Sequence, residues 1–208
     1  MIVTEDLKKV GRRPDFVVLT GNGVWELRVL KGLERKFPCD LILFFPKSRL
    51  ILKTGKRVYE AVRVYVSKYN FCRFLVLYDN EHHRSFSEDI RILNELGVRV
   101  LHCEQIVADR ILFIFGKLGS HGVVIYTSVQ GFRRSGECRG INEEIAALIR
   151  LRFGVSVNED HGAIRQFLRS QNMDITELVE SSGVRYLRQA FTLYLTLEEI
   201  NQGKDLLW

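Results

Sequence analysis

Two acidic residues, Asp79 and Glu81, directly follow an apolar run at residues 74–78 and are the first candidates for chemistry. Carboxylate oxygens are ligands that Mg²⁺ prefers, and a metal held in this way stabilises the charge that develops on a phosphate. The alternative is a turn in which Asp79 and Asn80 redirect the chain while Glu81 faces water. The spacing therefore indicates a Mg²⁺ site at Asp79 and Glu81, with a solvated turn as its rival.

The other residue types that bind metals indicate no second site. His82 and His83 come next, but neighbouring side chains in an extended segment point to opposite sides, so we do not expect them to hold one ion together. The chain has four cysteines and no CxxC pair. We interpret these cysteines as free thiols, because a cytosolic chain without such pairs rarely forms disulfides or zinc sites.

A glycine-rich turn, Gly21, Asn22 and Gly23, follows the first apolar run. Backbone N–H groups of such a turn can bind an anion at the start of a helix. The turn is not the dinucleotide fingerprint, because the third glycine of that motif would fall at Glu26. The sequence thus leaves two interpretations open, an anion-binding turn for a nucleotide or a tight strand-to-helix connection.

Basic residues gather in the first two thirds of the chain. The net charge is +9 over residues 1–141 and −3 over residues 142–208, and no acid occurs in residues 41–59. A clustered positive surface attracts phosphates, which predicts a polyanionic partner such as nucleic acid. The alternative is a solvated basic loop. The candidates for phosphate contacts are Lys47, Arg49, Lys53, Lys56 and Arg57.

The composition is that of a folded protein, with 46% hydrophobic residues and three prolines. No apolar run approaches the roughly 18 residues that span a bilayer. The first residues also lack the apolar centre of a signal peptide. We therefore expect a cytoplasmic protein with no membrane partner.

The elements that must position these residues alternate along the first hundred residues. Short apolar runs indicate strands at residues 15–20, 40–45, 74–78 and 98–102. Segments with helical spacing lie between them, at residues 24–37, 56–69 and 85–96, although the valines of residues 56–69 also suit a strand. This alternation predicts an α/β fold with a mainly parallel sheet and helices on both faces. The residues that follow each strand then meet at the carboxyl edge, where such sheets bind ligands.

The last third of the chain has a different pattern. Two further strands are predicted at residues 110–115 and 122–128, followed by a basic, glycine-rich loop at 130–140. Four helices are then predicted, at residues 141–153, 159–170, 175–182 and 184–201. We expect an α/β domain over residues 1–140 and a helical C-terminal region over residues 141–208, whose helices could bind a protein partner or a second copy of the chain.

The order of elements, with an acidic step at Asp79 and Glu81 after the third strand, resembles the Toprim domain of topoisomerases, primases and related nucleases. The resemblance covers residues 15–128 and matches Gly21 to the family glycine. It implies Mg²⁺-dependent phosphoester chemistry on nucleic acids. The family glutamate, which moves a proton, would fall at Thr20, and threonine cannot act as a carboxylate does.

The sequence therefore predicts a nucleic-acid-associated protein, with metal-dependent nuclease or phosphoesterase activity if it is an enzyme. Two other functions stay open. One is a noncatalytic regulatory module that binds a protein through its C-terminal helices. The other is a nucleotide-binding protein that uses the turn at Gly21 to Gly23.

Overall fold

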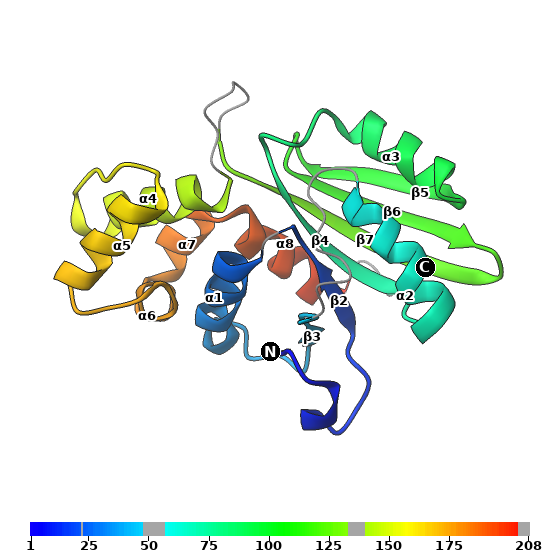
Figure 1. The fold of residues 1–208 in the computed structure, drawn as a ribbon, viewed down its shortest axis with the longest axis horizontal. Coiled ribbons are helices and arrows are strands. Elements are labelled where there is room, and N and C mark those ends of the chain that lie inside the picture. The colour runs from blue at the N-terminus through cyan, green and yellow to red at the C-terminus, as the bar shows by residue number, and fades with distance from the viewer. Residues whose placement is uncertain (22, 48–56, 133–139, 204–208) are drawn as a thin grey trace.

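Seven strands form one sheet in the computed structural model, in the order β1-β3-β2-β4-β7-β6-β5. The structure describes residues 1–21, 23–47, 57–132 and 140–203. Helices α4 to α7 gather beside the end of the sheet that carries α1, away from α2 and α3 (Figure 1). The α/β class and the mostly parallel sheet are as predicted from the sequence.

The elements follow the predicted alternation closely. The strands are β1 (Ile2–Thr4), β2 (Phe16–Leu19), β3 (Ile42–Phe44), β4 (Arg73–Asp79), β5 (Val98–Val107), β6 (Ile111–Leu118) and β7 (His121–Gln130). The α-helices are α1 (Val24–Leu33), α2 (Val58–Tyr69), α3 (Phe86–Glu95), α4 (Ile141–Phe153), α5 (His161–Ser170), α6 (Ile175–Glu180), α7 (Val184–Ala190) and α8 (Thr192–Asn201). Two short 3-10 helices, η1 (Leu7–Lys9) and η2 (Glu34–Lys36), complete the described elements.

Strands β1, β3, β2, β4 and β7 pair in parallel, whereas β6 runs antiparallel to both of its neighbours, β7 and β5. Strand β5 therefore points the same way as β4, although it lies at the far edge of the sheet. The sequence analysis ended this strand at residue 102, but pairing with β6 extends it to Val107. Cys103 and Glu104 consequently lie within β5 and not after its end.

Two clusters of buried side chains alternate along the strands. One joins Val18 and Leu75 to residues of α1, α4 and α8. The other joins Val17 and Val76 to residues of α2 and α3. This alternation follows from the period of two in a strand, because successive side chains point to opposite faces. Strands β2 and β4 are apolar at successive positions because each strand contacts one cluster with one face and the other cluster with its opposite face.

The C-terminal helices share the first of these clusters with the sheet. Leu148, Leu178 and Leu197 all belong to the cluster that contains Val18 and Leu75. The predicted helix at 184–201 is two helices, because Phe191 adopts an extended conformation between α7 and α8. Among the described residues, no helix has both the length and the apolar character needed to cross a membrane.

Candidate functional site at the carboxyl edge

Asp79 is the last residue of β4 and pairs in register with Gln130, the last residue of β7. The chain then turns, because the N–H of His82 donates to the Asp79 carbonyl at 2.9 Å. The N–H of Asn80 donates to the Gln130 carbonyl at 3.0 Å, which ties the turn to the end of β7. The predicted metal ligands therefore do lie at the carboxyl edge of the sheet.

The Asp79 carboxylate lies against the first turn of α4. The backbone of Ile141 hydrogen-bonds this carboxylate, and a methyl group at Gly140 would collide with it. An acid at a helix N-terminus is favourable, because the N–H groups there are otherwise unpaired and carry partial positive charge. Burial nevertheless raises the pKa of Asp79, and the nearby charge of Glu81 adds to this effect. Asp79 thus anchors α4 to the sheet.

A second buried carboxylate, Glu26 of α1, lies near Asp79. It accepts a hydrogen bond at 3.1 Å from the hydroxyl of Thr20. Burial raises the pKa of Glu26 to about 7, and the charge of Asp79 contributes to the increase. Thr20 thus stands where the Toprim resemblance requires a glutamate, and its hydroxyl contacts a glutamate from the following helix. Glu26 is a third acid at this edge, and it was not selected from the sequence as a site residue.

Glu81 and the two histidines after it have separate surroundings. Glu81 is exposed, and its carboxylate lies 3.3 Å from the ring of His82. His83 instead packs against Phe86, and its Nε2 lies 3.1 Å from the buried carboxylate of Asp89. The two histidines thus have different partners, although residues 80–82 form a turn and not the extended segment that the sequence predicts.

The acids at this edge do not form a group of metal ligands. Within the described ranges, no three His, Cys, Asp or Glu side chains converge closely enough to hold an ion. One Asp79 oxygen, Oδ1, is buried with no hydrogen-bond partner in the described part of the chain. The described residues therefore do not fit a centre of three acids, and Mg²⁺ at Asp79 and Glu81 stays a prediction.

The predicted basic stretch is only partly described. Lys47 follows β3, is exposed, and has its Nζ 4.0 Å from a carboxylate oxygen of Glu5. Arg57 is exposed just before α2. The other three predicted phosphate contacts, Arg49, Lys53 and Lys56, lie outside the described residues. Nucleic-acid binding by this stretch stays a prediction.

The predicted anion-binding turn is described at Gly21 and Gly23, while Asn22 lies outside the described residues. Gly23 precedes α1 in a left-handed conformation and packs closely against Thr20 and the ring of Phe45. Because Glu26 lies in the first turn of α1, an anion at this turn would meet a carboxylate. These contacts favour the tight-turn interpretation.

Two acids in the first turn of α4 fix the chain as it leaves β7. The Glu143 carboxylate accepts a hydrogen bond at 3.0 Å from the N–H of Phe132. The Glu144 carboxylate accepts at 3.2 Å from Gly131 and at 3.1 Å from the N–H of Thr192. Burial raises the pKa of Glu144 to about 7. Together these bonds fix the backbone at Gly131 and Phe132, and Phe132 is 40% exposed.

A polar pocket of about 430 Å³ lies on one side of Phe132. Three connections at the carboxyl edge build it, after β4, between β5 and β6, and after β7. Its polar lining residues are Asn80, His83, Arg84, Ser85, Asp109 and Arg110. The guanidinium of Arg110 lies 4.4 Å from the centre of the Phe132 ring, which is a cation–π contact. The pocket therefore offers two guanidinium groups beside an exposed aromatic ring.

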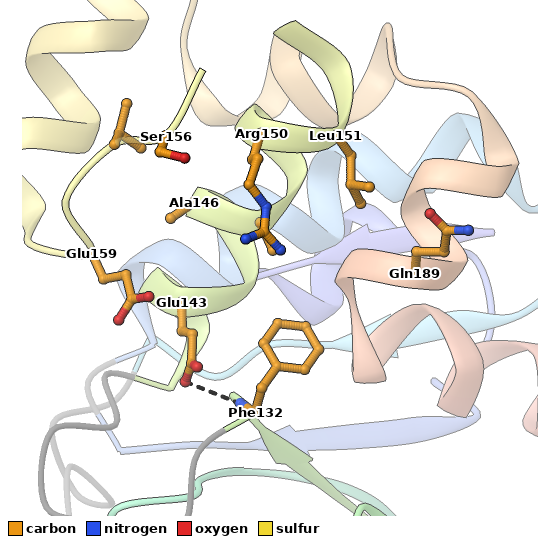
Figure 2. A pocket seen from close by; sticks show the side chains of 10 residues that line it. Phe132, Glu143, Ala146, Arg150, Leu151, Ser156, Glu159 and Gln189 are labelled. Carbon is orange, nitrogen blue, oxygen red and sulfur yellow. Dashed lines mark hydrogen bonds between the residues drawn. The ribbon is translucent and has the colours of Figure 1, made fainter. Parts of the chain in front are cut away.

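A second pocket, of about 610 Å³, is also lined by Phe132 and lies between α4, α7 and the segment before α5. In Figure 2, the side chains of Glu143 and Glu159 lie on one side of this pocket and Gln189 lies on the other, with Phe132 and Arg150 between them. Ala146, Ala147, Leu151 and Val157 supply apolar lining. Phe132 lines both pockets.

Comparison with models of protein families, with curated proteins and with solved structures finds no match. The Toprim resemblance therefore stays a prediction. Function must be argued from the arrangement of the residues at the carboxyl edge.

The residues around Phe132 were not selected from the sequence. Arg84 and Arg110 belong to no sequence motif. They line the same pocket only because β4 and β5 end at the same edge of the sheet. Glu143 and Glu144 carried a usable signal, since two acids that follow a glycine within four residues and begin an apolar helical pattern are typical of a helix N-terminus. That signal predicts the start of α4 but not the contact with the Phe132 backbone.

Proposed function

We propose that the protein binds single-stranded nucleic acid at the carboxyl edge of its sheet. In this proposal, Phe132 stacks on a base, the pocket with Arg84 and Arg110 receives phosphate, and the pocket beside α4 receives a base. The observation that carries the proposal is that Phe132, an exposed aromatic residue, lines both pockets.

The polar pocket supports the phosphate contact. Arg84 and Arg110 face one acid, Asp109, among its lining residues. Guanidinium groups bind phosphate oxygens with two parallel hydrogen bonds and stay charged at all physiological pH values. The excess of positive charge over residues 1–141 favours the approach of a polyanion to this part of the molecule.

The exposed ring supports a single strand over a duplex. Bases of a duplex are stacked on each other, whereas those of a single strand can stack on an aromatic side chain. Arg110 on one face of the Phe132 ring adds positive charge beside the stacked base. We infer that helices cover both faces of the sheet, so a strand would bind at an edge of the sheet and not on a face.

Fluorescence anisotropy with a labelled single-stranded 20-mer tests this proposal. We expect binding that weakens steeply with salt, because phosphate contacts release counterions. The double substitution Arg84→Ala and Arg110→Ala should weaken binding at least tenfold. It should also reduce the slope of log K against log salt by about 1.4, since each phosphate contact of a single strand contributes about 0.7.

The matched control is Arg91→Ala. Arg91 is an exposed arginine on α3 that pairs with Glu88 and Glu95 and lies outside both pockets. Its removal should leave the salt slope unchanged. Phe132→Ala should weaken the binding of a single strand more than the binding of a duplex of the same sequence. If Arg91→Ala lowered the affinity for the strand as much as the double substitution does, the result would contradict a specific site at the carboxyl edge.

The same samples test the predicted metal and the noncatalytic alternative. Mn²⁺- or Mg²⁺-dependent cleavage that is lost in Asp79→Asn would favour a Toprim-like nuclease. Binding without cleavage, unchanged by added metal, would favour a noncatalytic nucleic-acid binder. If no strand binds at any salt concentration, a protein-binding role of the C-terminal helices becomes the better proposal.

A further inference from the structure

His83 is held in a fixed orientation beside the polar pocket. Its Nε2 donates to the Asp89 carboxylate at 3.1 Å, and both side chains are nearly buried, with 6% and 3% of their surface exposed. The imidazole ring also packs against the rings of Tyr78 and Phe86. Three neighbours therefore fix His83, which is one of the residues that line the pocket.

The Asp89 carboxylate is fixed in turn by hydroxyl groups from two other elements. Tyr59 of α2 hydrogen-bonds this carboxylate, and the Tyr59 hydroxyl lies 2.9 Å from the hydroxyl of Thr127 on β7. Burial raises the pKa of Asp89, but the hydrogen bond from His83 acts in the opposite direction. A buried carboxylate held in this way orients a histidine, as the aspartate of a catalytic triad does.

This contact selects which nitrogen of His83 can react. A carboxylate only accepts hydrogen bonds, so the proton of the neutral imidazole lies on Nε2, which faces Asp89. Nδ1 then carries a lone pair and can accept a proton from a ligand. Asp89 also stabilises the positive charge that the ring gains in this step. The pair therefore has the properties of a general base and its positioning residue.

The same pocket carries groups that stabilise a reacting phosphate. Arg84 follows His83 in the chain, and Arg110 reaches the pocket from the connection between β5 and β6. Guanidinium groups that contact a phosphate also stabilise the charge that its oxygens gain in a displacement reaction. A base and two guanidinium groups thus line one pocket of about 430 Å³.

A bound RNA strand would bring its own nucleophile to this pocket. In the proposed function, Arg84 and Arg110 receive a phosphate of the strand. The 2′-hydroxyl of ribose is adjacent to the 3′-phosphate of the same nucleotide, and DNA lacks this hydroxyl. A base beside the phosphate therefore distinguishes the two strands by reactivity, because RNA can be cleaved whereas DNA can only be bound.

We propose that His83 is the general base of an RNA cleavage that needs no metal ion, with Asp89 as its positioning residue. His83 Nδ1 takes the proton of the 2′-hydroxyl, the 2′-oxygen bonds to phosphorus, and the bond from phosphorus to the 5′-oxygen breaks. The 5′-oxygen takes a proton from water, and His83 returns its proton to the solvent. The products are a 2′,3′-cyclic phosphate and a 5′-hydroxyl. This inference rests on the proposed function, which supplies the bound phosphate.

Incubation of the protein with a fluorescently labelled RNA 12-mer in EDTA tests the proposal. Mass spectrometry should show a product that ends in a 2′,3′-cyclic phosphate. DNA of the same sequence, and RNA with 2′-O-methyl groups, should bind but stay intact, which tests the step without any change to the protein. His83→Gln should lower the cleavage rate about a hundredfold or more, as the loss of a general base does. Asp89→Asn should lower kcat but leave KM and the affinity for DNA unchanged.

The matched control is His82→Gln. His82 is the neighbouring histidine, but it lies beside Glu81 and is not among the residues that line either pocket. This variant should cleave RNA at the rate of the unmodified protein. Thermal unfolding and the affinity for DNA show whether all three variants keep the fold and the binding site.

The possible failures of the proposal can be told apart. If the unmodified protein binds RNA but does not cleave it in EDTA, the inference fails and the proposed function stands. Cleavage that survives both His83→Gln and Asp89→Asn would also overturn the inference. Cleavage that requires Mg²⁺ and is lost in Asp79→Asn would assign the reaction to the predicted metal site instead. If neither RNA nor DNA binds, both the inference and the proposed function fail.

Discussion

Glu26 and Asp79 place two carboxylates in a buried region where a single negative charge is already costly. Burial is the main cause of the raised pKa of each residue. The charge of Asp79 raises the pKa of Glu26 further, so protonation of one acid relieves the other. The hydroxyl of Thr20 and the backbone of Ile141 stabilise the charged forms only in part. The pair therefore favours a proton at neutral pH.

This pair predicts that stability falls as the pH rises. The folded-state pKa of Glu26, about 7, lies above its ordinary value of 4.5, so the folded protein binds more protons in this interval. Glu144, with a pKa of about 7, acts in the same direction. The contribution is fully present below pH 4.5 and is lost as the pH rises through 7, with a size of about 3 kcal/mol for each residue.

Urea unfolding between pH 5 and pH 8 measures this effect. Glu26→Gln keeps the shape of the protonated acid without its titration, so its free energy of unfolding should depend less on pH than that of the unmodified protein. The difference between the two proteins should be largest at pH 8, where Glu26→Gln is the more stable. Parallel curves for the two proteins would show that Glu26 does not titrate in this range.

Gly140 predicts a large cost for one added methyl group. Its φ of +52° suits glycine, and a Cβ at this position would collide with the Asp79 carboxylate. Gly140→Ala should therefore lower the free energy of unfolding by about 3 kcal/mol. Gly154→Ala is the matched control, because Gly154 has a φ of +71° but open space around its Cβ. Gly154→Ala should lower the free energy of unfolding by about 1 kcal/mol, because only the backbone conformation opposes the substitution.

At the level of the elements, local patterns predicted most of the strands and helices. The apolar runs of β2, β3 and β4 and the helical spacing of α1 were sufficient to predict these elements, because each contacts the core through that pattern. The pattern of α2 favoured a helix but also suited a strand. Two features depended on distant partners. Three residues of β1 form a strand only by pairing with β3, and β5 extends to Val107 only because β6 folds back along it.

The contact between α1 and α6 depends on Gly32. A Cβ at Gly32 would lie 2.6 Å from the Val179 Cβ and 2.7 Å from the carbonyl oxygen of Thr176. Alanine favours a helix over glycine by about 1 kcal/mol, but the overlap should cost more and push the helices apart. Gly32→Ala should therefore lower the thermal unfolding temperature. A higher unfolding temperature for Gly32→Ala would show that α6 can move away from α1 without destabilising the protein.

At the level of the whole molecule, one cluster of buried side chains joins the sheet to the C-terminal helices. Val18, Leu75, Leu148 and Leu197 belong to the same cluster. The boundary predicted between residues 140 and 141 falls where α4 begins, but the core continues across it. Removal of α4 to α8 would expose the apolar side chains of the sheet that this cluster buries.

A chain that ends at residue 140 should therefore fail to fold alone. We expect broad amide resonances, aggregation and the loss of a cooperative thermal transition for residues 1–140. Addition of the separate segment 141–208 should restore folding only if the two parts associate. A sharp transition for residues 1–140 on their own would instead identify an independent domain.

The candidate site was less predictable than the fold. The sequence placed Asp79 and Glu81 at the carboxyl edge, because apolar strands predict where that edge lies. It did not select Phe132, Arg84 or Arg110, since these residues meet only through the order of β4, β7, β6 and β5. Strand order follows from long-range pairing, which a single sequence does not display.

The anchoring of the chain at Glu143 has a practical consequence for protein engineering. Its carboxylate accepts from the N–H of Phe132, and its own N–H donates to the Gly140 carbonyl at 3.2 Å. Both ends of residues 133–139 are thus fixed to one helical turn, whatever joins them. The sequence predicts a loop over residues 130–140, of which 133–139 lie outside the described residues. Because lengthening a loop between fixed ends costs little, a fluorescent protein inserted into this predicted loop should leave the fold intact and report on the occupancy of the two neighbouring pockets.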